Sequence, residues 1–573
     1  MRVALEKNRC AAVAALVGVA LGGLAMVGCD RPDWENPEYI AQVLEEGDQR
    51  TRHQAVSLLR EIDEEDRAAV APALATAYLE EERLRSDIMH HLLEWRDEGA
   101  MDAYLAELEE DHTGRSARVA EMLGRIELRD AIPQMIEIFE GTSNNDRRVG
   151  ILNGLAAMPD VQALDAAVEV LDLDVDNYPI DLHRAACTLV GEVALEDPEA
   201  ITDEAREKII YARFLGDERG RHTSEQCGLA IQQIGPSMVP QLIELFNGDN
   251  DDVQGLLMTY DSPADGEHFP QNQSRQRAVE HLSSLRAPEA VELFSEYIQT
   301  TVEVPQNLDS NEQKSAWGGT ERRVLNEMIR GLGNIGEHEA RPVIEGVLSR
   351  ETLGEHWGAI VGVPEAFQYQ QNSARALADL GDREARSALL EVEVQSEWVN
   401  HLQGQEVAAT EIFRPAWLGA QSFTYLGLAE DRGRFDEFAG QIGDDDLKEM
   451  VEGFASAFDV MDECEEVEDD GEKASCFAGF IDSDDTHQAI KAAFEVARLP
   501  AEVAGPVIAE AIKTDDLNAR QKITVVAYRV PTAELLANVE ELIDAGEGSS
   551  DDAVRADRRR LQMLHAWLHH HVE

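Results

Sequence analysis

The chain has 573 residues and carries 113 Asp and Glu against 50 Lys and Arg, which gives a formal net charge of -63. A field of this sign repels polyanions, so nucleic acids and anionic lipid surfaces are poor partners. Because 43% of the residues are hydrophobic, the composition excludes an acidic disordered tail. A chain of this length forms either several compact domains or one long repetitive structure.

Residues 1–28 have the pattern of an export signal. Three basic residues precede an apolar run over Ala11–Ala25, and the run ends in MVGC at residues 26–29. This motif resembles the lipobox of bacterial lipoproteins, which implies cleavage before Cys29 and a covalent lipid on its thiol. Residues 29–37 would then be a short tether; an uncleaved signal anchor and a buried thiol are the alternatives. We expect an exported protein, lipid-anchored to a bacterial membrane on the periplasmic or cell-surface side.

A helical pattern recurs through most of the remaining chain. Apolar residues at helical spacing are followed by a Gly, Pro or Asp turn and a second amphipathic helix, as in LGNIGEHEARPVIEGVL from Leu332. A single hairpin of this kind cannot bury its apolar faces, so successive copies must stack. One apolar residue close to the turn marks each copy, at Ile62, Trp95, Ile126, Met158, Val193, Ile234, Leu285, Ile335, Leu380, Leu499 and Val530.

This register resembles the HEAT-like repeats, in the short form found in phycobilisome-lyase-type proteins. The resemblance implies an all-α fold, an α-solenoid of stacked helical hairpins over residues 38–395. Residues 396–573 would be divergent helical repeats that continue the solenoid, with an acidic loop at 462–472. The resemblance predicts architecture and says little about activity, because solenoids host unrelated functions.

The spacing of the repeats predicts insertions along one edge of the solenoid. From Ile62 to Met158 the marking residues lie 33, 31 and 32 residues apart, and the later steps stretch to as many as 51. The excess falls at equivalent places, in segments 247–273, 299–321, 349–372 and 395–418. These segments and their borders hold clustered aromatic residues, namely Tyr260, Phe269, Trp317, Trp357, Phe367, Tyr369, Trp398 and Trp417. Interfaces favour aromatic residues, so we expect a binding face here; packing down onto the repeats is the alternative.

Four cysteines remain beyond Cys29. Cys464 and Cys476 flank the acidic loop, and an oxidising compartment favours a disulfide between them over two free thiols. Cys187 and Cys227 lie in apolar helical stretches, where we expect small core residues.

Two patterns offer weak metal ligands. Asp172, Asp174 and Asp176 alternate as in a calcium loop, but Asn177 and His183 stand where an EF-hand needs Gly and Glu, so at most a looser Ca²⁺ or Mg²⁺ site is expected. Near the C-terminus, His565 and His569 have the i,i+4 spacing of a zinc or copper pair, with no third ligand evident. We expect no resident metal or cofactor apart from the lipid at Cys29.

Catalytic motifs do not emerge from the sequence. Deoxyhypusine hydroxylase, a di-iron HEAT-repeat enzyme, needs repeated His-Glu pairs, and this chain has one, His338-Glu339. GxSxG, HExxH and P-loop motifs are also missing. The sequence therefore favours a non-enzymatic scaffold that binds an unidentified envelope protein. An enzyme with an unrecognised pocket among the insertions, such as a lyase-type relative, and a surface protein dependent on divalent cations are the alternatives.

The basic residues carry one further signal. Eight are Lys and forty-two are Arg. A lysine-poor, carboxylate-rich surface resembles proteins of salt-adapted organisms, in which high ionic strength screens self-repulsion.

Overall fold

The computed structural model describes residues 34, 36–110, 114–259, 270–300, 311–351, 363–392, 408–481, 483–546 and 551–572. Within these ranges the fold is all-α and contains no β-strand. Gly216 and His222 form an isolated antiparallel β-bridge. The chain divides into two compact units, residues 1–107 (unit 1) and 108–573 (unit 2). Each unit is described by itself.

Unit 1 is built from short helices that pack in pairs. They are α2 (Pro37–Glu46), α3 (Gln49–Leu58), α4 (Arg67–Glu80), α5 (Arg85–Trp95) and α6 (Met101–Glu109), of which the last runs into unit 2. Helix α4 packs against both α2 and α5. The hydroxyl groups of two buried tyrosines form hydrogen bonds within this unit. Tyr78 donates to the Glu107 carboxylate at 2.6 Å, and Tyr104 donates to the Leu92 carbonyl at 2.9 Å.

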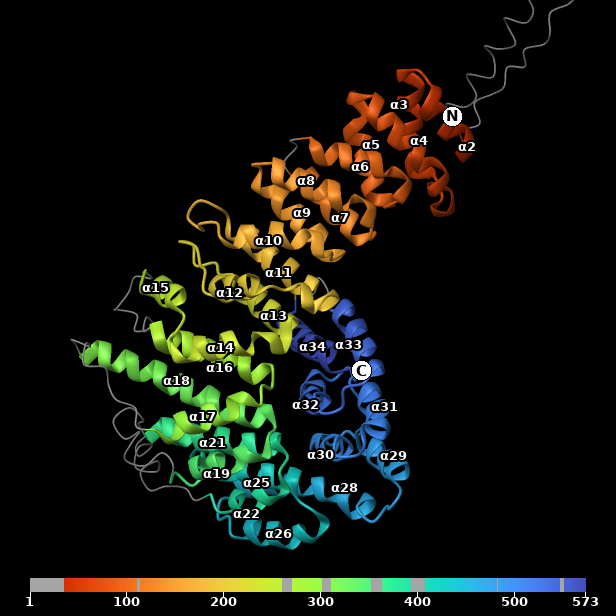
Figure 1. Cartoon of the computed structure of the whole chain (residues 1–573). Coiled ribbons are helices and arrows are strands. Elements are labelled where there is room, and N and C mark those ends of the chain that lie inside the picture. The colour runs from red at the N-terminus through yellow and green to blue at the C-terminus, as the bar shows by residue number, and fades with distance from the viewer. Residues whose placement is uncertain are drawn as a thin grey trace, which may run out of the picture. The chain divides into compact units, whose positions relative to one another are not determined.

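The first part of unit 2 is a row of stacked hairpins. Its helices are α7 (Arg115–Arg125), α8 (Ile132–Gly141), α9 (Asn145–Ala157), α10 (Leu164–Leu171), α11 (Ile180–Glu196), α12 (Asp203–Ala212), α13 (Ser224–Ile234), α14 (Val239–Asn247), α15 (Asp251–Thr259), α16 (Pro270–Ser284), α17 (Glu289–Gln299), α18 (Asn311–Ile335), α19 (Arg341–Leu348), α21 (Val363–Leu380) and α22 (Arg386–Leu389). The first helices of successive hairpins lie side by side, with α7 on α9, α9 on α11, α11 on α13, α13 on α16, α16 on α18 and α18 on α21 (Figure 1).

The row continues through the second part of unit 2. Its helices are α24 (Ala409–Ile412), α25 (Arg414–Leu426), α26 (Arg432–Gly440), α27 (Asp445–Gly453), α28 (Ala457–Cys464), α29 (Asp470–Ile481), α30 (Thr486–Val496), α31 (Ala501–Ala511), α32 (Leu517–Ala527), α33 (Ala533–Ala545) and α34 (Asp552–His571). Helix α21 packs on α25, α25 on α30, α30 on α32 and α32 on α34. The contacts between consecutive hairpins thus run from α7 to the last helix described.

The hairpin turns agree with the register read from the sequence. In several repeats the residue directly after the marking residue has a positive φ, which reverses the chain direction at the end of the first helix. Glycine takes this conformation without steric cost at Gly235, Gly336 and Gly381, where φ is 77°, 87° and 72°. Larger side chains adopt it at the equivalent positions Arg96, Glu127 and Arg286.

Unit 2 closes on itself. Its last helix, α34, packs against α13 and against the turn that follows α13, so the helices from α13 to α34 form a closed ring of contacts (Figure 1). Arg559 of α34 pairs with Glu225 of α13 at 2.6 Å, and the His570 ring is bonded through Nε2 to the Gln233 carbonyl at 2.7 Å. The periodicity of the sequence describes the hairpins one by one and gives no indication of this closure.

Two half-buried arginines connect opposite sides of the ring. Arg286, after α16, donates to the Val525 carbonyl of α32 and lies over the Tyr528 ring at 4.3 Å. Arg529 donates to the Asp379 carbonyl of α21. Burial lowers the pKa of both guanidinium groups to about 10, so both remain charged at neutral pH. Each charge is compensated by carbonyl oxygens and aromatic faces of the facing helices.

Candidate functional sites

Three aromatic residues of the expected binding face are buried. Trp317, Phe367 and Tyr369 are 5%, 0% and 1% exposed, and the Tyr369 hydroxyl donates to the Arg322 carbonyl at 3.3 Å. The prediction of a docking role was wrong for these three. Helices α18 and α21 begin inside the predicted insertions, at Asn311 and Val363, and carry these rings into the packing between repeats. Tyr260, Phe269, Trp357 and Trp398 lie outside the described residues.

Trp417 is the remaining member of that set, and it lines an apolar hollow on unit 2. The hollow has a volume of about 560 Å³ and lies between α25, α26 and α27. We call it the Trp417 hollow and define it by Phe413, Ala416, Trp417, Phe438, Ile442, Leu447 and Val451. Trp417 is half-buried and packs against Phe454, with 6.0 Å between the ring centroids.

The Trp417 hollow has apolar walls that remain partly exposed. Phe413, Phe438 and Ile442 are all half-buried, whereas Leu447 and Val451 form the buried floor. Sequence reasoning missed all five. Ile442 could have indicated this site, because it is a large apolar residue in the otherwise polar turn GQIGDDD. Turns of this kind are usually solvated and formed by polar residues and glycine.

Carboxylates surround the Trp417 hollow. Asp444 lies at its edge and caps α27 by accepting from the Leu447 amide at 2.9 Å, and the next two residues, Asp445 and Asp446, are exposed. The two cations that directly follow lining residues in the sequence are paired, since Arg414 contacts Glu411 at 3.1 Å and Lys448 contacts Glu452 at 3.7 Å. The local potential is therefore negative, in keeping with the whole chain.

A second cavity lies where the ring of unit 2 closes. It has a volume of about 550 Å³ and is bounded by the turns after α13, α16, α18 and α32 and by helix α34. Several polar side chains that line it already contact other residues. Arg286 lies over Tyr528, and His571 stacks on Trp567 with 4.0 Å between centroids. His338 contacts Asp382 at 3.1 Å. The described residues that line this cavity include no Ser, Thr or Cys, and Tyr528 supplies the one hydroxyl group among them.

Both pairs of body cysteines form disulfides. Cys464 and Cys476 are bridged, as the sequence favoured. Cys187 and Cys227 are also bridged, and the prediction that they are simple core residues was wrong in this respect, although both are fully buried. They lie on α11 and α13, which pack side by side, and this contact between first helices of consecutive repeats brings the two sulfur atoms together.

The aspartates of the loop after α10 are engaged with protein groups. Asp172 pairs with Lys208, while Asp174 accepts from the Asp176 amide at 2.9 Å and from the Asn177 side chain at 2.8 Å. These bonds describe a self-capped loop, and nothing in them points to a bound cation.

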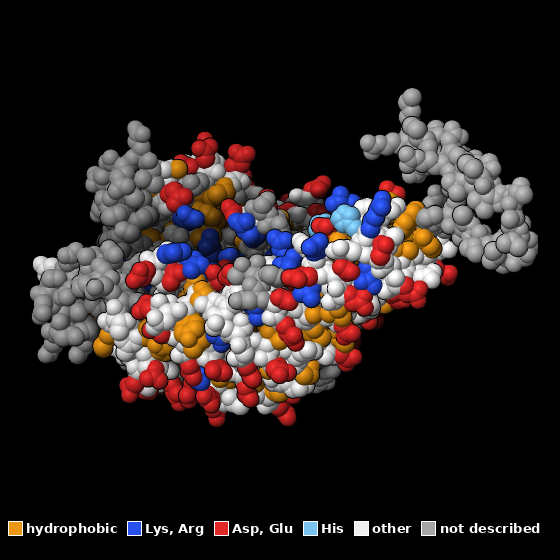
Figure 2. Space-filling view, turned by 90° about the horizontal axis from the view of Figure 1, so that it is seen from above, with side chains coloured by type: hydrophobic (Ala, Val, Ile, Leu, Met, Phe, Trp, Pro, Cys, Tyr) orange, Lys and Arg blue, Asp and Glu red, His pale blue; other side chains and the backbone are white. Residues whose placement is uncertain are grey.

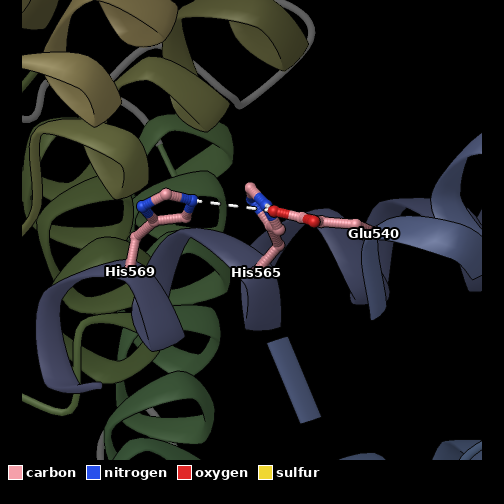
Figure 3. Close-up of side chains that lie close together, drawn as sticks. All are labelled: Glu540, His565 and His569. Carbon is pink, nitrogen blue, oxygen red and sulfur yellow. Dashed lines mark hydrogen bonds and ion pairs between the residues drawn. The ribbon is translucent and has the colours of Figure 1, made fainter. Parts of the chain in front are cut away.

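The histidines of α34 gain a third potential ligand from α33. His565 Nε2 lies 3.1 Å from a Glu540 carboxylate oxygen, and His569 Nε2 lies 4.0 Å from the same oxygen (Figure 3). Sequence reasoning missed Glu540, because only the folding of the α33–α34 hairpin brings it beside the two histidines.

The predicted lipid attachment residue Cys29 and the export signal lie outside the described residues. A search of the helices within those residues found none that combines the length and the hydropathy needed to cross a membrane.

The fold defines the class of protein as an all-α helical-repeat protein built from stacked hairpins. No protein-family model matches the sequence, and a sequence search of curated proteins finds no match. Among solved structures, the chain is similar to karyopherin Kap121p bound to the extreme C-terminus of the protein phosphatase Cdc14p, with a TM-score of 0.39 and 9% identity. That match covers 91% of this chain and 64% of the karyopherin.

Two further matches are of the same kind. Kap121p bound to Pho4p gives a TM-score of 0.39 at 11% identity over 93% of this chain and 65% of that one. Yeast importin-beta, Kap95p, gives 0.38 at 11% identity over 92% of this chain and 76% of that one. Similarity at this level assigns neither a partner nor a function to this chain.

Proposed function

We propose that this protein is a non-enzymatic scaffold of a bacterial cell envelope, held to a membrane by a lipid on Cys29, and that it docks a protein partner in the Trp417 hollow. The observation that carries the docking proposal is the hollow itself, an apolar depression large enough for one or two bulky side chains.

Elsewhere in the part of the chain that the structure describes, highly exposed large apolar side chains lie singly. Among the described residues, the large hydrophobic side chains with high exposure are Leu79, Val161 and Met258, which lie singly on separate helices. Scattered apolar residues of this kind are normal on a protein surface, whereas a concave apolar group with a polar rim is typical of a recognition site. The Trp417 hollow has this second character.

The negative charge around the Trp417 hollow favours a positively charged partner segment. Carboxylates lie at the rim of the hollow. Figure 2 shows Asp and Glu side chains over much of the face in view. Charge complementarity favours a segment in which an apolar anchor residue is flanked by Lys or Arg, and it opposes an acidic segment.

A peptide titration tests the docking site. The probe is a short dye-labelled peptide with a central Phe flanked by lysines, and its binding to the full chain is followed by fluorescence anisotropy. Ile442→Asp places a charge in the apolar wall and is expected to weaken binding about 10- to 100-fold, the equivalent of losing roughly 1.5–3 kcal/mol of side-chain burial.

The matched control is Met258→Asp, which introduces the same charge at a residue that is 75% exposed and lies on α15. The added carboxylate attracts the basic peptide in both variants. If only Ile442→Asp weakens peptide binding, the loss must therefore come from the damaged apolar wall. Equal binding by both variants, or equally tight binding of a glutamate-flanked peptide, would contradict the proposed site.

Lipid anchoring rests on the sequence motif at residues 26–29 and has its own test. Mass spectrometry of the protein recovered from membranes is expected to find a lipid-modified N-terminal peptide that begins at Cys29. Cys29→Ser should remain unprocessed and unmodified. An unmodified peptide spanning Val27 to Trp34 in the membrane-derived protein would overturn the anchor without affecting the docking site.

A further inference from the structure

Helices α33 and α34 form an antiparallel hairpin that collects three metal-binding side chains at one place. Donor atoms of Glu540, His565 and His569 all lie within 4.8 Å of one another. The two imidazole rings stand one helical turn apart on α34, with 4.7 Å between their centroids, and both are directed toward the side on which Glu540 approaches from α33 (Figure 3).

The geometry is close to that of a coordination sphere. Donors at about 2.0–2.1 Å around a tetrahedral ion stand about 3.3 Å apart, and here His565 and His569 lie 3.1 Å and 4.0 Å from the Glu540 carboxylate. Small side-chain rotations are enough to bring all three donors onto one ion. All three side chains are partly exposed, so an ion can enter from solvent.

Additional carboxylates lie around this cluster. Glu192 of α11 interacts electrostatically with His565, and Glu196 of the same helix interacts with His569. Glu192 is held by the Gln233 side chain at 2.8 Å, and the Gln233 carbonyl in turn is bonded to His570. The cluster therefore lies where the C-terminal hairpin meets α11 and α13, in a negative environment that attracts cations.

The neighbouring histidines of the tail have other contacts. His570 is bonded to the Gln233 carbonyl at 2.7 Å, while His571 stacks on Trp567 and its Nδ1 lies 2.8 Å from the Trp567 carbonyl. His565 and His569 therefore face Glu540, whereas His570 and His571 do not. This arrangement differs from non-specific metal binding by a run of histidines.

We propose that Glu540, His565 and His569 bind one Zn²⁺ ion, with a fourth position open to water, and that the ion fastens α33 to α34 where unit 2 closes. Two imidazoles and one carboxylate suit Zn²⁺, which takes four ligands from His nitrogen, Cys sulfur, carboxylate oxygen and water, whereas Ca²⁺ requires six to eight oxygen ligands. This site differs from the Ca²⁺ site considered at Asp172, Asp174 and Asp176.

Zinc titration of the metal-stripped full chain tests the proposal, with a chromophoric chelator as competitor. One Zn²⁺ per chain is expected, and X-ray absorption should show two imidazole ligands. Glu540→Gln, His565→Gln and His569→Gln should each weaken binding by at least about tenfold, the loss that changes even outside the ligand sphere cause. His571→Gln is the matched control on the same helix and should bind as the parent does.

Hydrogen exchange supplies a second readout. Zinc is expected to slow exchange of the α33 and α34 amides in the parent and in His571→Gln, and to have no such effect in Glu540→Gln. If Glu540→Gln binds as tightly as the parent, or if His571→Gln loses as much as His569→Gln, the metal is captured by the tail alone and the site is wrong. Circular dichroism of each variant checks that the hairpin still folds.

Discussion

Replacing Glu495 with alanine is expected to destabilise α30 by about 3–5 kcal/mol, because the change leaves a buried lysine without its counter-ion. Lys491 is fully buried, and its Nζ donates to Glu495 at 2.7 Å and to the carbonyls of Tyr425 and Gly427 at 3.1 Å and 2.6 Å. Burial lowers the pKa of Lys491 to about 8, although the Glu495 carboxylate favours the charged form. Hydrogen exchange of the α30 amides, followed by mass spectrometry, measures the local free energy of opening.

Glu495 also joins α30 to a distant repeat. Its carboxylate accepts from Arg383, in the turn after α21, at 2.5 Å and lies 3.7 Å from Arg498. Burial alone would raise the pKa of Glu495, but Lys491, Arg498 and Arg383 outweigh it and hold that pKa below its ordinary value. The stabilisation is therefore complete above the ordinary pKa of a glutamate, and it is lost as the pH falls through the lower folded-state value.

Two controls accompany this prediction. Glu510→Ala removes a carboxylate from an exposed pair with Lys513, on the next helix, and should cost less than about 1 kcal/mol. The double change Lys491→Met with Glu495→Leu removes both buried charges and should recover much of the loss. A Glu495→Ala variant within about 1 kcal/mol of the parent would show that the carboxylate does not compensate Lys491.

Removing the Cys187–Cys227 disulfide is the second large expected effect. The bridge joins residues 40 positions apart, and loop entropy predicts a loss of about 4 kcal/mol for the variant in which both become alanine. Both side chains are fully buried between α11 and α13, so alanine adds only a small packing defect. Thermal unfolding of the non-reduced parent and variant measures the difference.

The second bridge is the internal comparison. Cys464 and Cys476 are 12 positions apart, for which the same relation gives about 3 kcal/mol, so the double alanine variant should be affected less. Alkylation of the denatured, unreduced protein should leave all four cysteines unlabelled. Labelling of Cys187 or Cys227 would contradict the bridge.

The sequence could predict the hairpins because their determinants are local. Apolar periodicity and turn chemistry act over a few residues, and the positive φ of Gly336 and Gly381 directly after Ile335 and Leu380 follows from them. The same reasoning failed for the aromatic residues of the long repeats. The segment around Trp317 is predicted as an insertion, whereas in the structure it belongs to a helix that begins at Asn311.

What the sequence could not predict depends on helices distant along the chain. Glu540 and His565 become neighbours only when α33 and α34 pair, and Cys187 meets Cys227 only when α11 and α13 stack. Helix α34 packs against α13 through contacts such as the ion pair between Arg559 and Glu225. Neither local sequence indicates that these two residues pair. The Trp417 hollow similarly draws its walls from three helices.

Photo-crosslinking from the Trp417 hollow in intact cells tests the central claim most directly. A photoreactive side chain at position 442 is expected to join one envelope protein through a segment that has an apolar residue flanked by Lys or Arg, and the lysine-flanked peptide should compete for this adduct. The same group at position 258 should not give it. No adduct at position 442, an adduct common to both positions, or one formed with an acidic segment would contradict the proposed docking function.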